Sequence, residues 1–495
     1  MTLKPTSETF LFFILYTICC VSSSENVEFP CKILDPLLFR INSTIYVPQN
    51  SSAPFALSAN FTCIYKFYVQ KNEYLRLSVI NSLLDKDVIE FVDSVGYKRN
   101  LTVQSVANDE LFATYGHGHV RIITGPQGRS RALLVFQWLE MPDSNWTEKL
   151  HKNESGQNVD CMDIQRKPIT FTAVDDNERV ALNIAHSANV FDRFDSYFIF
   201  DGPDTSSPVV GRMSSHVVVP FIASNHSVTV IGLTKQVVYS NVIANIRSNI
   251  AGYRKYQAAV VIDQYGGQLD SINQTIAVTF IAKDANQLYI TSLTFFEDRR
   301  VTFTNFKASS DLYVSTTFKK SGLPQSCSSP SSQLDILFPQ QFPASQVTVE
   351  LTDCSVYMVL SKNTPANFYM VGDDERMGYV FTPSFFDGQA TSDWNLTLSS
   401  NQTCHFSTTV ESVTIYNEQV LAITVYNEKG LSAMSTVITG NETGGAAEGI
   451  GTSVNMYLYE SKGQGQAKIR YHISKISERI TGVSILALLA LYTIW

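Results

Sequence analysis

The sequence is poor in charge and has no basic cluster. Charged residues make up 17% of its 495 residues, and the formal net charge is −8. No stretch is rich in Lys and Arg, so we expect no nucleic-acid partner. Aromatic residues reach 12%. Few charges together with many aromatic side chains favour packed β structure over disorder.

The common catalytic motifs are also missing. The chain contains neither H-E-x-x-H nor G-x-S-x-G, which would mark a zinc protease or a serine hydrolase. The Gly-rich stretch 444–451 lacks the Lys-Ser/Thr of a phosphate-binding loop, so we predict a flexible hairpin loop there. These absences predict a protein that is not an enzyme and needs no cofactor.

Two further patterns could carry chemistry, and each has a simpler interpretation. His117 and His119 would share one face of a strand, as a metal-binding pair can, but neither an acid nor a third His stands near them in the sequence. We interpret them as solvent-facing strand histidines. The acidic clusters 175–178 and 373–375 could supply paired carboxylates for acid/base chemistry. Both lie in hydrophilic stretches typical of hairpin loops, so no catalytic or metal site is predicted.

Neither end contains an apolar run of the roughly 20 residues that a spanning helix needs. Residues 1–24 have the features of a signal peptide, with Lys4, the apolar run Phe10–Val21 and small residues at 21–24. The uncharged run Ile480–Trp495 resembles the disposable tail of a GPI-attachment signal, which predicts a lipid-anchored protein. A tail-anchored helix or a core segment are the alternatives. The candidate attachment residues are Gly463 and Gly465, with Ser474 and Ser477 as weaker choices.

N-glycosylation sequons are numerous. Eleven follow the signal peptide, and their spread over the chain predicts that the whole mature protein is extracellular or lumenal. The sequon asparagines are Asn42, Asn50, Asn60, Asn100, Asn145, Asn153, Asn225, Asn273, Asn395, Asn401 and Asn441.

Long helical periodicity is absent, and period-2 alternation dominates. We therefore predict an all-β chain of antiparallel sandwiches. Two stretches interrupt the pattern: residues 143–158, predicted as a linker, and Ser321–Gln333, predicted as a loop or a domain boundary. A repeat at 414–418 and 424–428 suggests two neighbouring strands. The strand candidates are Tyr74–Val79, Ala132–Trp138, Val228–Ile231, Thr275–Ile281, Val347–Leu351 and Val420–Tyr426.

Residues Phe194–Arg212 (FDSYFIFDGPDTSSPVVGR) carry a specific resemblance. They resemble the centre of a CUB domain, in which a strand leads through D-G-P to S-S-P-x-x-G-R. The resemblance implies a calcium site in some members, with Asp195 at one ligand position. The matching upstream position holds Ser187, and the later loop offers Lys235. One carboxylate cannot supply the six or more oxygens that calcium needs, so the site is predicted to be lost.

The first domain, residues 27–142, resembles the CUB-like module of secreted nematode proteins. The resemblance rests on Asn42–Pro48, Asn60–Cys63, Val92–Gly96 and Val135–Trp138. It implies a Cys31–Cys63 disulfide, display at an intestinal surface and a role in innate defence against pathogens. The resulting organisation is a tandem of CUB-like β-sandwich (jelly-roll) domains. The predicted parts are 1–24 signal peptide, 27–142 first domain, 143–158 linker, 159–262 second domain, 263–478 a β region with one or two further modules, and 479–495 the tail.

The cysteine pattern contains no C-x-x-C, which gives no support to a zinc site or a redox motif. Six cysteines follow the signal peptide, and an even number in an exported chain predicts three disulfides. Beside Cys31–Cys63, the shortest spacing suggests Cys327–Cys354 and leaves Cys161–Cys404, with Cys354–Cys404 as a rival. The cysteines are Cys31, Cys63, Cys161, Cys327, Cys354 and Cys404.

These features predict a non-enzymatic binding or adhesion glycoprotein at the cell surface or plasma membrane. It would attach to the membrane through its lipid anchor or tail and bind a protein or glycan through loops on a rigid β scaffold. A secreted hydrolase with an active site hidden in 263–478 and a structural surface-coat protein are the alternatives.

Overall fold

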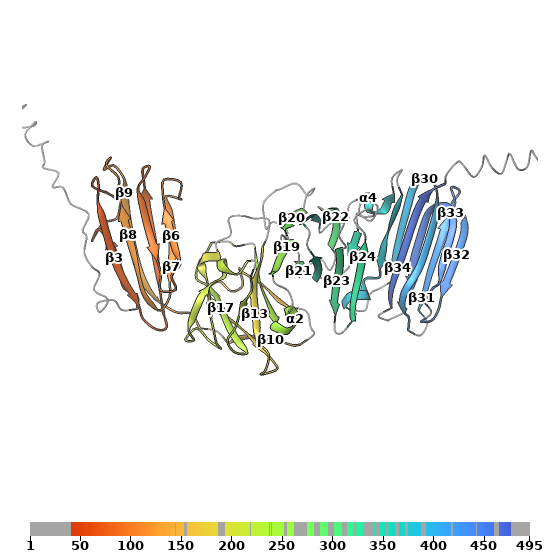
Figure 1. Ribbon diagram of the computed structural model, residues 1–495, viewed down its shortest axis with the longest axis horizontal. Coiled ribbons are helices and arrows are strands. Elements are labelled where there is room, and N and C mark those ends of the chain that lie inside the picture. Colours follow the sequence, from red (N-terminus) through yellow and green to blue (C-terminus); the bar gives the residue numbers. More distant parts are fainter. Residues whose placement is uncertain are drawn as a thin grey trace, which may run out of the picture. The chain divides into compact units, whose positions relative to one another are not determined.

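A computed structural model describes most of the chain. The described residues are 41–143, 145–152, 156–186, 194–217, 219–236, 238, 240–251, 255–261, 275–281, 288–295, 301–308, 314–320, 323–329, 340–342, 346–352, 355–361, 366–371, 375–387, 393–416, 419–441, 443–459 and 465–476. The chain divides into two units, 1–141 and 142–495. Both consist almost entirely of β-sheet, which confirms the predicted all-β class (Figure 1).

The first unit is a sandwich of two antiparallel sheets. One sheet has the order β1-β9-β4-β7, with β2 also paired to β9, and the other has the order β3-β8-β5-β6. Buried and exposed residues alternate along β3 and β9, as expected where one face of each sheet packs on a core. The strands are β1 (Thr44–Val47), β2 (Phe55–Ala56), β3 (Thr62–Val69), β4 (Glu73–Ser82), β5 (Val88–Val92), β6 (Lys98–Leu101), β7 (Asn108–Ala113), β8 (Gly116–Ile123) and β9 (Arg131–Glu140).

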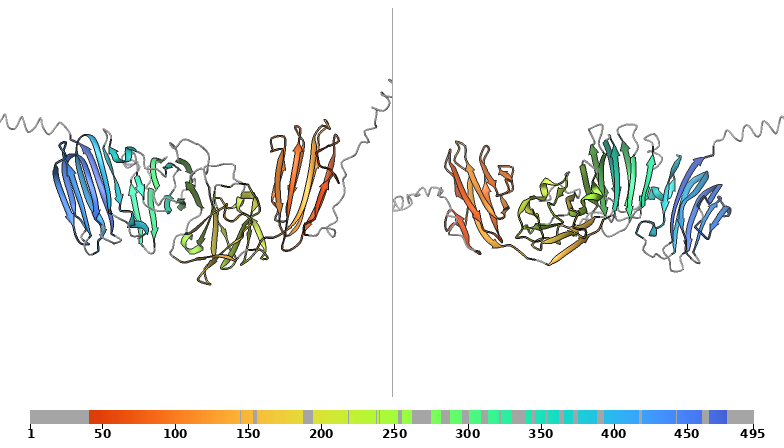
Figure 2. Two further views of the ribbon diagram at one scale, coloured as in Figure 1. Left: turned by 180° about the vertical axis from the view of Figure 1, so that it is seen from behind. Right: turned by 60° about the horizontal axis from the view of Figure 1, so that its bottom comes forward.

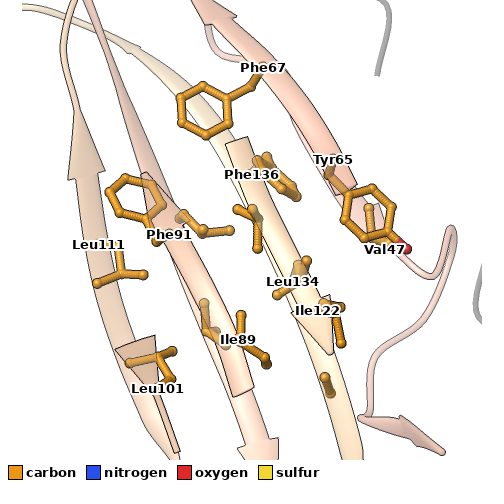
Figure 3. Packing of buried hydrophobic residues seen from close by; sticks show 14 of the residues in the cluster. Val47, Tyr65, Phe67, Ile89, Phe91, Leu101, Leu111, Ile122, Leu134 and Phe136 are labelled. Carbon is orange, nitrogen blue, oxygen red and sulfur yellow. The ribbon is translucent and has the colours of Figure 1, made fainter. Parts of the chain in front are cut away.

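Aliphatic side chains make up most of the core of this sandwich, and aromatic rings pack among them (Figure 3). The Phe67 ring lies 5.9 Å from that of Phe91 and 6.3 Å from that of Phe136, measured between centroids. Gly118 on β8 makes room for this packing, because a Cβ there would lie 2.7 Å from the carbonyl oxygen of Val92 and would overlap the Phe67 ring.

The second sandwich begins at residue 146. One sheet has the order β10-β12-β17-β14-β15, and the other starts β11-β18-β13, with β16 paired to β13. The strands are β10 (Trp146–Leu150), β11 (Gln157–Asp160), β12 (Ile169–Ala173), β13 (Val180–His186), β14 (Tyr197–Phe200), β15 (Val209–Arg212), β16 (Phe221–Ile222), β17 (Ser227–Gly232) and β18 (Asn241–Ile246), followed by the one-turn helix α2 (Arg247–Ile250).

The predicted linker 143–158 is wrong, because it contains β10 and the start of β11. Each lies at the edge of its sheet, and β10 pairs in parallel with β12. Few aliphatic residues are needed at such an edge, and Leu150 is the only residue of β10 that is buried. Trp146 packs against the core from one side and carries Lys167 Nζ at 4.8 Å from its ring on the other.

Between residues 255 and 361 the structure describes mainly the backbone. Strand β19 pairs in parallel with both β13 and β21, so the second sheet of the second sandwich continues as β21-β26-β23-β24. A separate sheet has the order β20-β27-β22-β25. The predicted loop at 321–333 is wrong, since most of it forms β24. The strands are β19 (Lys255–Val261), β20 (Thr275–Ile281), β21 (Leu288–Phe295), β22 (Val301–Ala308), β23 (Val314–Lys320), β24 (Leu323–Ser329), β25 (Gln340–Phe342), β26 (Gln346–Thr352) and β27 (Ser355–Ser361).

The C-terminal part is a seven-stranded sheet of long strands, which run side by side in all views (blue in Figures 1 and 2). Its order is β29-β34-β30-β33-β31-β32, with β28 paired to β30. Alternate residues of four long strands meet in one core. The elements are α4 (Ala366–Tyr369), β28 (Met370–Val371), β29 (Arg376–Phe381), α5 (Ser384–Asp387), β30 (Trp394–Thr414), β31 (Val420–Tyr426), β32 (Ser432–Ile438), β33 (Ala446–Tyr459) and β34 (Gln466–Lys475).

Two predictions fail in this sheet. The repeat at 414–418 and 424–428 does not mark neighbouring strands, because β33 lies between β30 and β31. The Gly-rich stretch 444–451 is no flexible loop beyond its first two residues, since Ala446–Gly451 belongs to β33. Its glycines serve close packing instead: a Cβ on Gly451 would overlap the carbonyl oxygen of Tyr426 and lie 3.0 Å from Val425 Cγ1.

The two edges of the C-terminal sheet differ. At β29, the buried side-chain amide of Gln340 bonds with both backbone groups of Tyr379: Tyr379 N donates to Oε1 over 2.9 Å, and Nε2 donates to the Tyr379 carbonyl. A side chain thus takes the place of a neighbouring strand. At the other edge, β32 pairs with β31 alone among the described strands, contains no charged residue and leaves Met434 and Val437 exposed.

Candidate functional site

The outer face of the sheet β3-β8-β5-β6 carries a group of polar and aromatic side chains that includes His117 and His119. Strand pairing arranges them in rows across the sheet. Tyr68 lies opposite His117 in the first row. The second row runs Lys66, His119, Val92 and Lys98, and the third runs Ile64, Arg121, Glu90 and Asn100. These side chains alternate with core residues, so they point away from the core.

Three rings form a cluster at the first row. The Tyr68 and His117 rings lie 4.7 Å apart and those of Tyr68 and Tyr115 6.2 Å apart. A hydrogen bond with Tyr115 raises the pKa of the Tyr68 hydroxyl. Trp138 Nε1 donates to the carbonyl of Tyr68 over 2.9 Å and fixes the backbone beneath the ring. Tyr115 is 52% exposed. We call Tyr68, Tyr115 and His117 the aromatic platform.

The second and third rows contain several basic side chains and a single carboxylate, that of Glu90. Lys98 forms an ion pair with Glu90, and His119 Nε2 lies 3.9 Å from the same carboxylate. The hydrogen bond from Lys98, together with the charges of Lys98, Arg121 and His119, lowers the pKa of Glu90 despite its partial burial. Lys66 is exposed on β3. No carboxylate among the described residues lies within ion-pair distance of it.

The predicted positions of His117 and His119 on one strand face are confirmed. No local pattern indicated that Glu90 lies beside His119, because that acid comes from β5, about 30 positions earlier in the chain. Lys98 and Arg121 already neutralise this carboxylate. Within the part of the chain that the structure describes, no three His, Cys, Asp or Glu side chains gather closely enough to hold a metal ion.

In the second sandwich, the CUB-resembling segment forms the predicted strand, turn and second strand. Strand β14 leads into the loop 201–208 and then into β15. Two threonines fix the loop: Thr170 Oγ1 donates to the Pro203 carbonyl and Thr229 Oγ1 to that of Gly202, each over 2.9 Å. Gly202 has φ 159°, and a Cβ on it would lie 2.8 Å from Ser207 Cβ, so glycine is required.

Asp195 lies before β14, in the 3₁₀ turn Phe194–Ser196, and not in the strand as the resemblance implied. Its backbone carbonyl accepts a hydrogen bond from Arg212 Nη1, and the Arg212 guanidinium lies 4.3 Å from the centroid of the Phe198 ring. Lys235 is exposed. Ser187, the third position of the comparison, lies outside the described residues.

Replacing Asp195 by alanine tests the loss of the calcium site. We expect the variant to be less stable by about 1 kcal/mol, equally in calcium and in chelator. The sequence places Ser187 and Lys235 where the other acids would be needed, and one carboxylate cannot supply the six or more oxygens of a calcium site. Thermal melts of wild type and variant in both buffers provide the measurement. A calcium-dependent rise in the melting temperature of the wild type that vanishes in the variant would show that Asp195 is a calcium ligand.

The structure contradicts the predicted disulfide of Cys404. Cys63 is disulfide-bonded, and its expected partner Cys31 lies outside the described residues. Cys404 has a buried free thiol, 3.3 Å from Ser400 Oγ, so neither Cys161–Cys404 nor Cys354–Cys404 is present. Cys161 and Cys404 belong to two different cores. The pairing Cys327–Cys354 involves side chains outside the described residues and stays a prediction.

Every sequon asparagine that the structure describes is exposed. Asn441 uses its Oδ1 to accept a bond from Ile415 N over 2.7 Å, and Asn395 Oδ1 accepts one from Asn455. Both bonds leave Nδ2, the atom that carries a glycan, free to react. Asn153 and Asn273 lie outside the described residues. The exposed asparagines are Asn42, Asn50, Asn60, Asn100, Asn145, Asn225, Asn395, Asn401 and Asn441.

The acidic cluster 175–178 lies in a loop, as predicted, but the loop is not the predicted hairpin, because it joins β12 and β13, which belong to different sheets. Asp175 Oδ1 accepts a bond from Asn177 N over 2.9 Å, and Glu178 pairs with Lys152 over 3.0 Å. Glu178 lines a shallow, open hollow beside α2. Burial alone would raise the pKa of Glu178, but hydrogen bonds from Ser248 and Lys152 lower it overall. The carboxylate therefore stays ionised and is unsuited to donate a proton. In the cluster 373–375 only Glu375 is described, and it contacts His472 at 2.5 Å.

The C-terminal sheet bears on the predicted lipid attachment. Attachment at Gly463 or Gly465 would remove everything that follows, including β34, which lies between β29 and β30 and contributes Ile469 and Tyr471 to the core. The structure therefore argues against both glycines, and Ser477 is the candidate that lies beyond β34. No helix among the described residues is long and apolar enough to cross a bilayer. The tail itself lies outside them.

Comparison with curated proteins and solved structures finds only distant similarity. No curated protein matches the chain. Among solved structures, it is similar to the CUB1-EGF-CUB2 domains of rat MASP-1 (9% identity, 42% of this chain and 98% of that one, TM-score 0.16). It is also similar to the same region of human MASP-1/3 (9%, 42% and 100%, 0.18) and to the full extracellular region of zebrafish Gpr126/Adgrg6 (8%, 66% and 52%, 0.17). These TM-scores are too low to transfer any role.

The family comparison is more specific. Residues 27–142 match the model of the CUB-like domain. The same residues contain the sandwich of β1 to β9, with its single hydrophobic core. Residues 27–142 of this chain are therefore assigned as a CUB-like domain.

Proposed function

We propose that the protein is an extracellular, non-enzymatic binding glycoprotein displayed on a membrane surface. The CUB-like domain supports this proposal, since CUB domains are commonly extracellular binding modules. The observation that carries it furthest is the exposure of every described sequon asparagine, over both units of the chain. A glycan at each of these positions would extend into solvent without disturbing a core.

The more specific part of the proposal is a role in innate defence at an exposed epithelial surface. It rests on the resemblance of the first domain to secreted nematode CUB-like modules. Ligand recognition on the rigid sandwiches, with the membrane attachment at the far end of the chain, would suit capture of a particle or a soluble ligand.

The direct test is a binding screen of the full-length protein, purified from expressing cells, against arrays of glycans and of bacterial surface polymers. We expect selective and saturable binding without any chemical change in the ligand. Turnover of an arrayed ligand would instead favour a hydrolase. Absence of binding to every arrayed surface, while the glycans are intact, would favour a structural coat protein.

The membrane attachment has its own test. We expect a phospholipase specific for GPI linkages to release the protein from intact cells, because the run after Ile480 has the composition of a signal that is removed on attachment. Replacing Ser477 by a bulky residue should reduce surface display, whereas Gly463→Ala should not. Protein that stays on the membrane after complete digestion would support a tail-anchored helix instead.

A further inference from the structure

The aromatic platform and the basic row beside it form a surface with a defined chemistry. The rings of Tyr68, Tyr115 and His117 form a partly exposed apolar cluster with polar edges, in which the His117 ring is inclined by 45° and the Tyr115 ring by 71° to the Tyr68 ring. Aromatic faces of this kind pack against the C–H groups of a sugar ring, while the hydroxyl groups at the edge remain able to hydrogen-bond.

The cationic side chains of this face favour an acidic carbohydrate over a neutral one. The chain has a net charge of −8, yet the second and third rows of this face contain three cations, Lys66, Lys98 and Arg121, against Glu90 alone. Lys98 forms an ion pair with that carboxylate, and the charge of Arg121 acts on it as well. Lys66 is exposed and has no such ion pair among the described residues, so it is the cation most available to a ligand. Lys66 is two residues from Tyr68 on β3, a separation of about 7 Å along a strand. Adjacent sugar units could therefore contact both.

The predicted glycans of the chain itself leave this end of the face open. Asn60 precedes β3, and Asn100 lies in the third row, opposite Glu90. Both sequons lie toward the end of the sheet that holds Thr62 and Ile123. The aromatic platform occupies the opposite end, where β3 finishes and β8 begins, and that end of this sheet contains no sequon. Asn42 lies at the same end of the sandwich, before β1 of the other sheet, where its backbone N–H bonds to the Trp138 carbonyl.

We propose that the aromatic platform, together with Lys66, binds an acidic polysaccharide, with one sugar ring on Tyr68 and His117 and a sulfate or carboxylate on Lys66. Charge-assisted hydrogen bonds from the Lys66 ammonium would fix the acidic group, and the rings would supply the contact area. The inference deepens the proposed binding function and depends on it.

The test measures binding of a heparin octasaccharide to the full-length protein by calorimetry at two salt concentrations. Tyr115→Ala, His117→Ala and Lys66→Gln should each weaken binding about fivefold to tenfold. Matched controls are Tyr46→Ala, which removes a tyrosine 41% exposed on the other sheet, and Lys149→Gln, which removes an exposed cation on β10. Both should bind as the wild type does. Hydrogen exchange of β3 and β8 should be unchanged in all five variants.

A neutral glucose octamer and inorganic polyphosphate serve as control ligands in the same experiment. We expect neither to bind as tightly, because the first lacks the acid and the second lacks the rings. Equal binding of polyphosphate, or loss of affinity in Lys66→Gln without any loss in Tyr115→Ala and His117→Ala, would show simple charge attraction and overturn the proposal. Absence of heparin binding while the array screen still finds a ligand would refute this site alone. Absence of any ligand would count against the binding function itself.

Discussion

Replacing Trp138 by alanine is expected to lower the free energy of unfolding of the first sandwich by about 3–5 kcal/mol. The side chain is fully buried on β9, between β1 and β4, and its ring stacks on Phe136 with centroids 6.1 Å apart. Alanine would leave a cavity beneath the aromatic platform and would remove the hydrogen bond to the Tyr68 carbonyl. Hydrogen-exchange mass spectrometry of peptides from β3, β4 and β9 measures the loss in the full chain, where several modules unfold separately.

Trp138→Phe is an intermediate variant. It keeps an aromatic ring in the core but removes the indole N–H and part of the buried ring volume, so we expect a smaller loss than for alanine, of about 2 kcal/mol. Peptides from the C-terminal sheet should exchange at the wild-type rate in both variants. An alanine variant no less stable than the phenylalanine variant would mean that Trp138 does not fill the core as described.

Gly451→Ala is expected to destabilise the C-terminal sheet by about 2–3 kcal/mol. The added Cβ would overlap the backbone carbonyl of Tyr426 on β31, and a backbone atom cannot move aside as a flexible side chain can. The strands β31 and β33 would have to separate locally, which breaks pairing along a register that extends from Val420↔Tyr459 to Tyr426↔Ser453. Hydrogen exchange of these two strands provides the measurement.

Gly440→Ala is the matched control for this prediction. It lies in the turn after β32, its added Cβ would meet nothing within 4 Å, and its φ is not in the left-handed region. We expect its stability to stay within about 0.5 kcal/mol of wild type. Equal behaviour of the two glycine variants would show that the close approach at Gly451 is relaxed in solution.

Much of the fold could be predicted because the alternation of apolar residues is a local property. The predicted strands Thr275–Ile281 and Val420–Tyr426 coincide with β20 and β31 to the residue. The turn at Gly202 could also be predicted from Asp201-Gly202-Pro203, because glycine adopts backbone conformations that residues with a Cβ rarely adopt. Alternation gave a wrong prediction where a strand lies at the edge of a sheet or is rich in small residues, as in β10, β24 and the first half of β33. It also missed β18, whose residues are all buried.

The candidate site was predictable only in part. The sequence places His117 and His119 on one strand, but their neighbours Tyr68 and Glu90 come from β3 and β5. Pairing between distant strands depends on the packing of the whole sandwich, and no local pattern encodes it. The same limit applies to Cys404: an even count of cysteines predicts a partner, while the tertiary structure decides whether any other sulfur comes within reach.

The difference between the two edges of the C-terminal sheet affects the tendency of this protein to aggregate while it folds at high concentration. An open, uncharged strand such as β32 invites pairing with another chain, and secreted β proteins usually guard such edges. Gln340 guards the β29 edge, so aggregation would begin at β32. The sequon at Asn441 follows β32 by three residues, and its amide oxygen is tethered to Ile415 while its nitrogen is free. A glycan added to Asn441 during synthesis would sterically hinder the β32 strands of two partly folded chains from pairing.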